Sequence, residues 1–133
     1  MNSKNAIKIM LLIVSVITIF HLCILLKIIP YEITWGGRLK NDTEMYMFEG
    51  ISILVNLVLG LTLLIKGKYV KQLISLKIVN VILWIFLILF ALNTIGNMLA
   101  ETTFEKSFAV VTLFLSLLIG VILKSKRNEH TVK

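Results

Sequence analysis

The chain has 133 residues, of which 58% are hydrophobic, and its mean hydropathy is +0.95. Soluble domains are about 45–50% apolar, so this composition excludes a soluble globular domain and indicates a single membrane domain. The formal charge of +7 lies in short clusters between apolar runs, without a basic face of interleaved aromatics. We therefore expect these charges to set topology and contact anionic lipid, and we expect no nucleic-acid partner.

Four apolar runs are each long enough to cross a bilayer, which takes roughly 17–25 residues. Only helices or closed barrels satisfy the backbone in lipid, and uninterrupted runs of this length predict helices. The first run is too long for the apolar part of a signal peptide and has no cleavage motif before Pro30, so we expect it to remain. The fold prediction is an all-α antiparallel bundle of four transmembrane helices in one domain, with helices at about 7–29, 43–65, 73–97 and 107–123 and a polar cytoplasmic tail at 124–133.

Two helix ends carry recognisable signals. Pro30 should end the first helix, because proline cannot donate the next backbone hydrogen bond. Asn41 followed three residues later by Glu44 is typical of a capping box at the start of the second helix. The loop between the second and third spans is short, so these helices should be antiparallel neighbours.

The basic residues predict the orientation. Excluding Lys77, which lies at the start of the third span, nine Lys or Arg flank the ends that include both termini, and four flank the opposite ends. By the positive-inside rule, both termini are expected in the cytoplasm of a multi-pass protein of the plasma or bacterial inner membrane. Twelve lysines against two arginines, with many Ile and Asn, indicate an AT-rich coding bias and favour a bacterial source.

Glu49 is the first candidate site residue, because it lies inside the second span. Ser52, Asn56 and Gly60 follow at offsets that place all four on one helical stripe. Polar residues in membrane helices usually face the bundle, which favours a proton-binding or cation-binding carboxylate. The alternative is a solvated carboxylate near the interface.

His21, in the outer half of the first span, is the second candidate, and Glu49 is its expected partner. Such a pair can relay protons or orient a small ligand, since histidine titrates near neutral pH. The alternative is a neutral imidazole bonded to a hydroxyl or carbonyl. Asn93 and Asn97, four apart at the outer end of the third span, either complete this polar pocket or join helices as structural hydrogen bonds.

The connection YEITWGGRL is the least generic stretch of the chain. Trp35 precedes two glycines that permit a tight turn, and the guanidinium of Arg38 can pair with a carboxylate or bind a headgroup phosphate. These two residues are expected to cover the polar cluster; the alternative is an interfacial hairpin that spaces the helices. In the fourth span Thr112, Ser116 and Gly120 form a small-residue stripe that permits close packing within the bundle, between subunits, or against a partner membrane protein.

The chain contains no nucleophile beside a base and no metal, nucleotide or redox motif, so we expect no cofactor, no metal and no catalytic residues, and an enzyme is an unfavoured third alternative. The blocks WGGRL, EMYMFE and ISILVN resemble those of small bacterial four-helix membrane proteins of uncharacterised activity, and this resemblance implies the fold alone. The small multidrug resistance transporters share the size and helix count, but they carry a glutamate deep in the first helix, where this chain has His21.

The sequence therefore supports two functional hypotheses. The first is a minimal transporter or sensor with a small-ligand, lipid or proton site formed by His21, Glu49, Ser52 and Asn93 in the outer half of the bundle. The second is a non-catalytic accessory subunit that uses the stripe of the fourth span to bind its partner.

Overall fold

The computed structural model describes residues 1–34 and 39–131, with the backbone alone for 126–131. Every regular element in these ranges is helical: α1 (Ser3–Leu25), the short 3-10 helix η1 (Tyr31–Ile33), α2 (Asp42–Lys66), α3 (Leu76–Met98) and α4 (Thr103–Thr131). Each of the four α-helices is long and apolar enough to cross a bilayer. The chain is a multi-pass membrane protein with the four-helix architecture that the sequence predicts.

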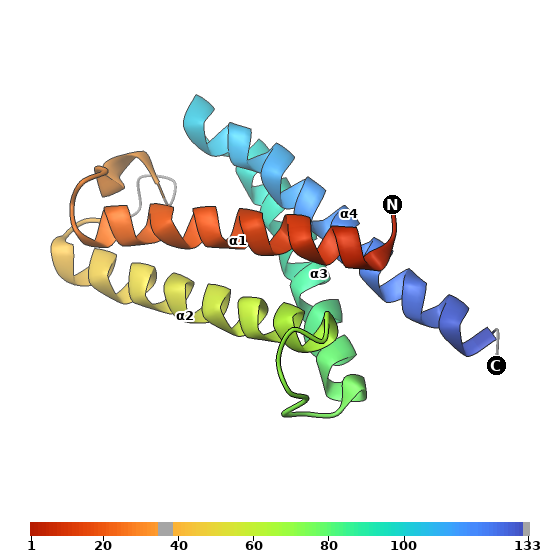
Figure 1. Ribbon diagram of the computed structural model, residues 1–133. Coiled ribbons are helices and arrows are strands. Elements are labelled where there is room, and N and C mark those ends of the chain that lie inside the picture. The colour runs from red at the N-terminus through yellow and green to blue at the C-terminus, as the bar shows by residue number, and fades with distance from the viewer. Residues whose placement is uncertain (35–38, 132–133) are drawn as a thin grey trace.

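The helices associate as two pairs. Figure 1 shows α1 and α2 side by side in opposite directions, with α3 and α4 running across them. The α3–α4 and α1–α2 contacts are the most extensive, and α1 also packs on α4 and α2 on α3. We call the end of the bundle at which residues 26–41 connect α1 to α2 the loop end. The start of α4 lies there too, since Phe104 and Phe108 contact the ring of Phe20 on α1.

Helix α1 ends at Leu25, four residues before the predicted end at Ile29. Lys27 takes a left-handed backbone with φ of 61°, which allows the N–H of Ile28 to donate to the Cys23 carbonyl at 2.8 Å. This arrangement is a Schellman motif, usually formed with glycine, and it reverses the chain before the proline is reached. The sequence prediction placed this boundary wrongly because a lysine at the left-handed position carries no turn signal.

The other boundaries follow their caps. Asn41 accepts the N–H of Glu44 at 2.9 Å, as predicted, although the carboxylate of Glu44 accepts the N–H of Lys40 instead of completing the reciprocal bond. Helix α3 begins at Leu76, three residues later than predicted, because the Ser75 hydroxyl caps it. Helix α4 begins at Thr103, earlier than predicted, and continues to Thr131, so most of the expected tail extends the helix.

Apolar packing is concentrated in two clusters. The larger one combines all four helices away from the loop end, with Met10, Leu63, Leu83 and Ile119 among its buried members. The smaller one lies at the loop end and contains Ile24, Leu39 and Met45, with Phe20 and Tyr31 packed against it. Most large apolar side chains outside these clusters are exposed, as expected where lipid is the solvent.

Candidate functional site

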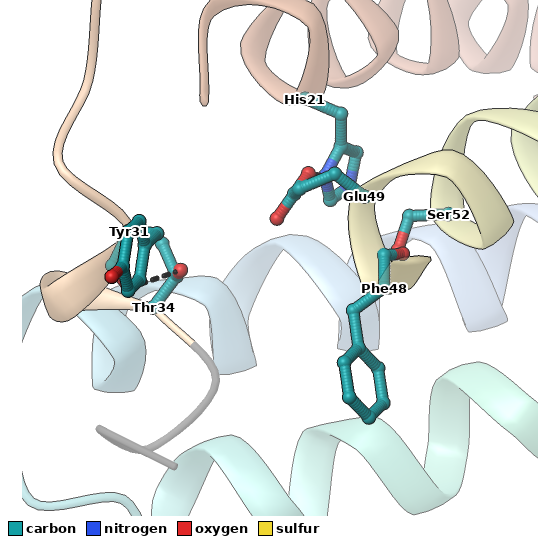
Figure 2. A network of polar contacts seen from close by, with 6 residues as sticks. All are labelled: His21, Tyr31, Thr34, Phe48, Glu49 and Ser52. Atoms are coloured by element: carbon teal, nitrogen blue, oxygen red, sulfur yellow. Dashed lines mark hydrogen bonds and ion pairs between the residues drawn. The ribbon is translucent and has the colours of Figure 1, made fainter. Parts of the chain in front are cut away.

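A polar pair joins α1 to α2 between the two apolar clusters. His21 Nδ1 lies 2.6 Å from Glu49 Oε2, and Figure 2 shows the two side chains pointing toward one another from neighbouring helices. Glu49 is fully buried, whereas the His21 side chain retains 18% of its exposure. The contact predicted between these residues is present, and the alternative of a solvated Glu49 is wrong.

The short separation requires a proton between the two atoms, because an imidazole nitrogen and a carboxylate oxygen without one are both acceptors. The proton belongs either to an Nδ1–H that donates to a carboxylate or to a carboxylic acid that donates to Nδ1. When the proton is on Nδ1, the pair has a net charge of −1 if Nε2 is bare and is neutral overall if Nε2 is protonated; when the proton is on Glu49, Nε2 carries the imidazole proton and the pair is neutral. The pair can therefore gain or lose one proton while its own hydrogen bond is retained.

The pair lies within the depth expected for hydrocarbon. His21 is seven residues from the middle of α1 and Glu49 five from the middle of α2. At ~1.5 Å per residue these positions are ~10 Å and ~8 Å from the midplane when the helices are centred, against a half-thickness of ~15 Å. An ionisable pair at this depth is unusual and is generally functional in membrane proteins.

The described parts of the connection between α1 and α2, residues 26–34 and 39–41, pack against the loop end. Thr34, at the end of η1, is buried, and its hydroxyl donates to the Tyr31 carbonyl at 2.8 Å. Leu39 is also buried, in the smaller apolar cluster. Trp35 and Arg38, which the sequence assigns to the cover of the site, lie outside the described residues.

Ser52 lies one turn along α2 from Glu49 but does not join the pair. Its hydroxyl donates to the carbonyl of Phe48 at 2.9 Å, within the same helix, and the Phe48 ring points away from the pair (Figure 2). Of the polar stripe that the sequence predicts on α2, only Glu49 engages α1 through a side-chain hydrogen bond among the described residues.

The amides of α3 are not part of the cluster. Asn93 is exposed and Asn97 half-buried, and in the described part of the chain neither hydrogen-bonds to His21 or Glu49. Thr94 between them is the residue that faces the bundle, where its hydroxyl lies 2.9 Å from that of Thr112 on α4. One residue of helical rotation is ~100°, so a side chain next to an inward one turns toward the surface. The predicted pocket of four polar residues is reduced to the His21–Glu49 pair.

Two features were missed at the sequence level. Phe20 packs edge-on against the imidazole of His21, with ring centroids 5.8 Å apart, and thereby connects the pair to α4. Lys27 Nζ donates to Asp42 Oδ2 at 2.5 Å and closes α1 onto α2 above the buried pair. The short connection between the two helices, with opposite charges at its ends, was the signal for this second contact.

The charge and hydrogen bond of Asp42 have an electrostatic consequence. They raise the pKa of Lys27 above its ordinary value of 10.5, with a smaller contribution from the neighbouring Tyr46. Lys27 lies beyond the end of α1 and is half-exposed, so the ammonium stays charged at any physiological pH.

The chemistry available at the site is that of a proton donor and acceptor. His21 and Glu49 provide two potential metal ligands, and within the described ranges no third His, Cys, Asp or Glu gathers with them. Comparison of the chain with protein-family models, with curated proteins and with solved structures finds no match in any of the three. The resemblance to small bacterial membrane proteins therefore remains an expectation from the sequence.

Proposed function

We propose that this protein is a proton-binding or small-ligand-binding protein of the plasma or bacterial inner membrane, acting as a minimal transporter or sensor. The observation that supports the proposal is the 2.6 Å contact between His21 and the fully buried Glu49 within the span of α1 and α2. A buried ionisable pair is costly to maintain in a membrane, and it links two helices whose packing can respond to its protonation.

The orientation in this proposal places both termini in the cytoplasm, so that the loop end faces outward. The experiment introduces single cysteines at the exposed positions Lys40 and Lys68, in a Cys23→Ser background, and labels intact cells with a membrane-impermeant maleimide. Labelling at position 40 alone supports this orientation. Labelling at position 68 alone would reverse it and move the polar pair to the cytoplasmic half.

The proton site is tested through the imidazole itself. The chain has two histidines, so a His130→Gln variant labelled with ¹⁵N-histidine reports on His21 alone in nanodiscs. We expect Glu49→Gln to shift the midpoint of the His21 titration, and the exposed Glu101→Gln, which makes the same chemical change, to leave it in place. A midpoint that both variants leave unchanged would rule out proton binding by the pair.

A proton-flux measurement in proteoliposomes distinguishes a transporter from a sensor. A pH gradient with an internal pH dye measures proton flux through the wild type and the Glu49→Gln variant. Flux that disappears in Glu49→Gln supports a transporter. An impermeable protein whose His21 resonance still responds to pH supports a sensor.

The alternative of an accessory subunit has one supporting observation. A Cβ placed on Gly120 would meet no atom within 4 Å, so the surface of α4 is open at that point. The rest of the stripe is used within the chain, since Thr112 bonds to Thr94 and the Ser116 hydroxyl lies 3.4 Å from the Leu87 carbonyl. A Gly120→Leu variant that dissociates an oligomer or a co-purified partner would favour this alternative.

A further inference from the structure

An apolar groove lies between α1 and the first half of α4. It has a volume of about 480 Å³, and its lining contains only apolar side chains, including Ile13, Ile17 and Phe20 on α1 and Val110 and Phe114 on α4. All of these residues lie within the two candidate membrane spans, so the groove opens toward lipid. The medium that reaches it is the bilayer.

The groove has the length of a lipid chain in one leaflet. The lining on α1 extends from Leu12 to Phe20, which is ~12 Å of helical rise, close to the ~15 Å depth of half a hydrocarbon core. Phe20 contacts Phe108 with ring centroids 5.6 Å apart, and these rings bring α1 and α4 together at the loop end. The groove therefore has a defined end near the proposed outer interface.

That end is continuous with the polar pair. Ile13, Ile17 and His21 are spaced four apart on α1, so the position of His21 follows the groove lining along the helix, while Nδ1 of its imidazole faces Glu49 on α2. Phe20 lines the groove and also packs against the imidazole. Nδ1 of His21 is engaged by Glu49, whereas Nε2 has no hydrogen bond with the described residues. A polar group at the end of an apolar chain can therefore bond to Nε2.

A positive charge lies at the same end. Lys106 is one turn before Val110 on α4, which places the two residues on one stripe. It is exposed and forms no ion pair within the described part of the chain, in contrast to Lys27, which is held by Asp42. An ammonium at this position attracts an anionic headgroup.

We propose that the groove between α1 and α4 binds one acyl chain of an anionic phospholipid, with its polar end at His21 Nε2 and its phosphate at Lys106. This inference rests on the proposed function because it uses the same imidazole, and it specifies a lipid as the ligand. Protonation of the pair would change the hydrogen-bonding state of the group that contacts the lipid.

The experiment titrates the full chain in mild detergent with dioleoyl-phosphatidylglycerol or dioleoyl-phosphatidylcholine, and counts retained lipids by native mass spectrometry. Val16 lines the groove and is 59% exposed, so Val16→Trp fills the groove without displacing the core; Val81→Trp, at a 52% exposed position on α3, is the matched control. We expect one retained phosphatidylglycerol, bound about tenfold more weakly by Val16→Trp and normally by Val81→Trp.

The headgroup is tested with a second pair of variants. A lysine near an anionic lipid contributes about 1 kcal/mol, so Lys106→Gln should weaken phosphatidylglycerol binding about fivefold and leave phosphatidylcholine unchanged. Lys40→Gln, at an exposed position of the α1–α2 connection, should have no effect. Both variants replace surface side chains, so they remain informative if the tryptophan variants fold poorly.

Two results would overturn the proposal. One is equal lipid retention by Val16→Trp and Val81→Trp. The other is a dimer that Val16→Trp dissociates without loss of lipid, which would assign the groove to a second copy of the chain. The ¹⁵N titration of His21 is measured separately. If Glu49→Gln shifts the titration midpoint but no lipid binds in the groove, the lipid site alone is refuted. If lipid binds in the groove but Glu49→Gln leaves the midpoint unchanged, the proton site alone is refuted.

Discussion

Glu49 Oε2 and His21 Nδ1 are joined by a 2.6 Å contact that lies below a second, exposed contact between Lys27 and Asp42 on the same two helices. The buried contact has little access to water, whereas the side chains of the outer one are each about half exposed. Separating the charges of the exposed Lys27–Asp42 contact costs little, because water replaces the lost interaction. Separating the buried His21–Glu49 contact costs much more, because little water reaches it. The two contacts should therefore differ sharply in their response to mutation, pH and salt.

Loss of the imidazole should destabilise the protein more than neutralisation of its partner. His21→Leu removes the 2.6 Å contact with the fully buried Glu49, and a buried hydrogen bond to a charged group contributes about 1.5–3 kcal/mol, so we expect this variant to lower the free energy of unfolding by about 2 kcal/mol. Glu49→Gln removes the charge, keeps the size and can still bond to Nδ1, so about 1 kcal/mol is expected. Steric-trap unfolding in bicelles measures both values. Equal losses in the two variants would contradict a buried charge.

The outer contact should contribute only while Lys27 is charged. Asp42 raises the pKa of Lys27 above 10.5 in the folded protein. The contact therefore contributes its full stabilisation at any pH below the pKa of Lys27 in the unfolded chain, and this stabilisation is lost as the pH rises through the pKa of Lys27 in the folded protein. Lys27→Gln should therefore lower the melting temperature slightly at pH 7 and 9, equally at both, and the difference should shrink in high salt. If the difference in melting temperature between Lys27→Gln and the wild type disappears between pH 7 and pH 9, Lys27 does not have a raised pKa. Lys40→Gln is the control.

The helical architecture was predictable because membrane helices are specified by long apolar runs, which are visible in any single sequence. The helix ends were less predictable, since they depend on local hydrogen bonds. Asn41 and Glu44 carry a cap signal that was recognised, whereas Ser75 and the left-handed Lys27 determine ends that were misplaced.

Only part of the site was predictable from the sequence. His21 and Glu49 were identified because ionisable residues within apolar runs are rare and usually face the interior of the bundle, where they find a polar partner. Asn93 was included wrongly because amides occur on either face of a helix, and rotation about the helix axis is fixed only by packing against neighbours. Phe20 was missed because an aromatic residue in an apolar run carries no signal until α4 is placed beside it.

The end of α2 allows a test of backbone strain. Lys68 has a φ of 62°, and the N–H of Tyr69 donates to the Leu64 carbonyl at 2.9 Å in a second Schellman motif. A left-handed backbone costs a residue with a Cβ roughly 1–2 kcal/mol, and glycine avoids that cost while gaining freedom in the unfolded chain. We expect Lys68→Gly to raise the free energy of unfolding by about 0.5 kcal/mol, against a loss for Lys71→Gly, which lacks the left-handed backbone. A loss of stability in Lys68→Gly would show that its side chain is needed.

The hydroxyls of Thr94 and Thr112 provide the last test, because they connect α3 to α4 inside the membrane span. Each hydroxyl oxygen also lies within hydrogen-bond distance of a carbonyl of its own helix, at 2.8 Å for Thr94 and 2.9 Å for Thr112. Whichever hydroxyl donates across to the other helix, its partner can donate to its own helix. The local bonds satisfy the hydroxyls when the partner is removed, so the inter-helix bond should contribute the ~0.6 kcal/mol typical of membrane proteins. A double-mutant cycle with Thr94→Val and Thr112→Val, measured by steric trapping, isolates this term. A coupling energy near zero would mean that the helices are held by apolar packing alone, whereas a value above ~1.7 kcal/mol would exceed the range for such bonds and indicate a connected polar network between α3 and α4.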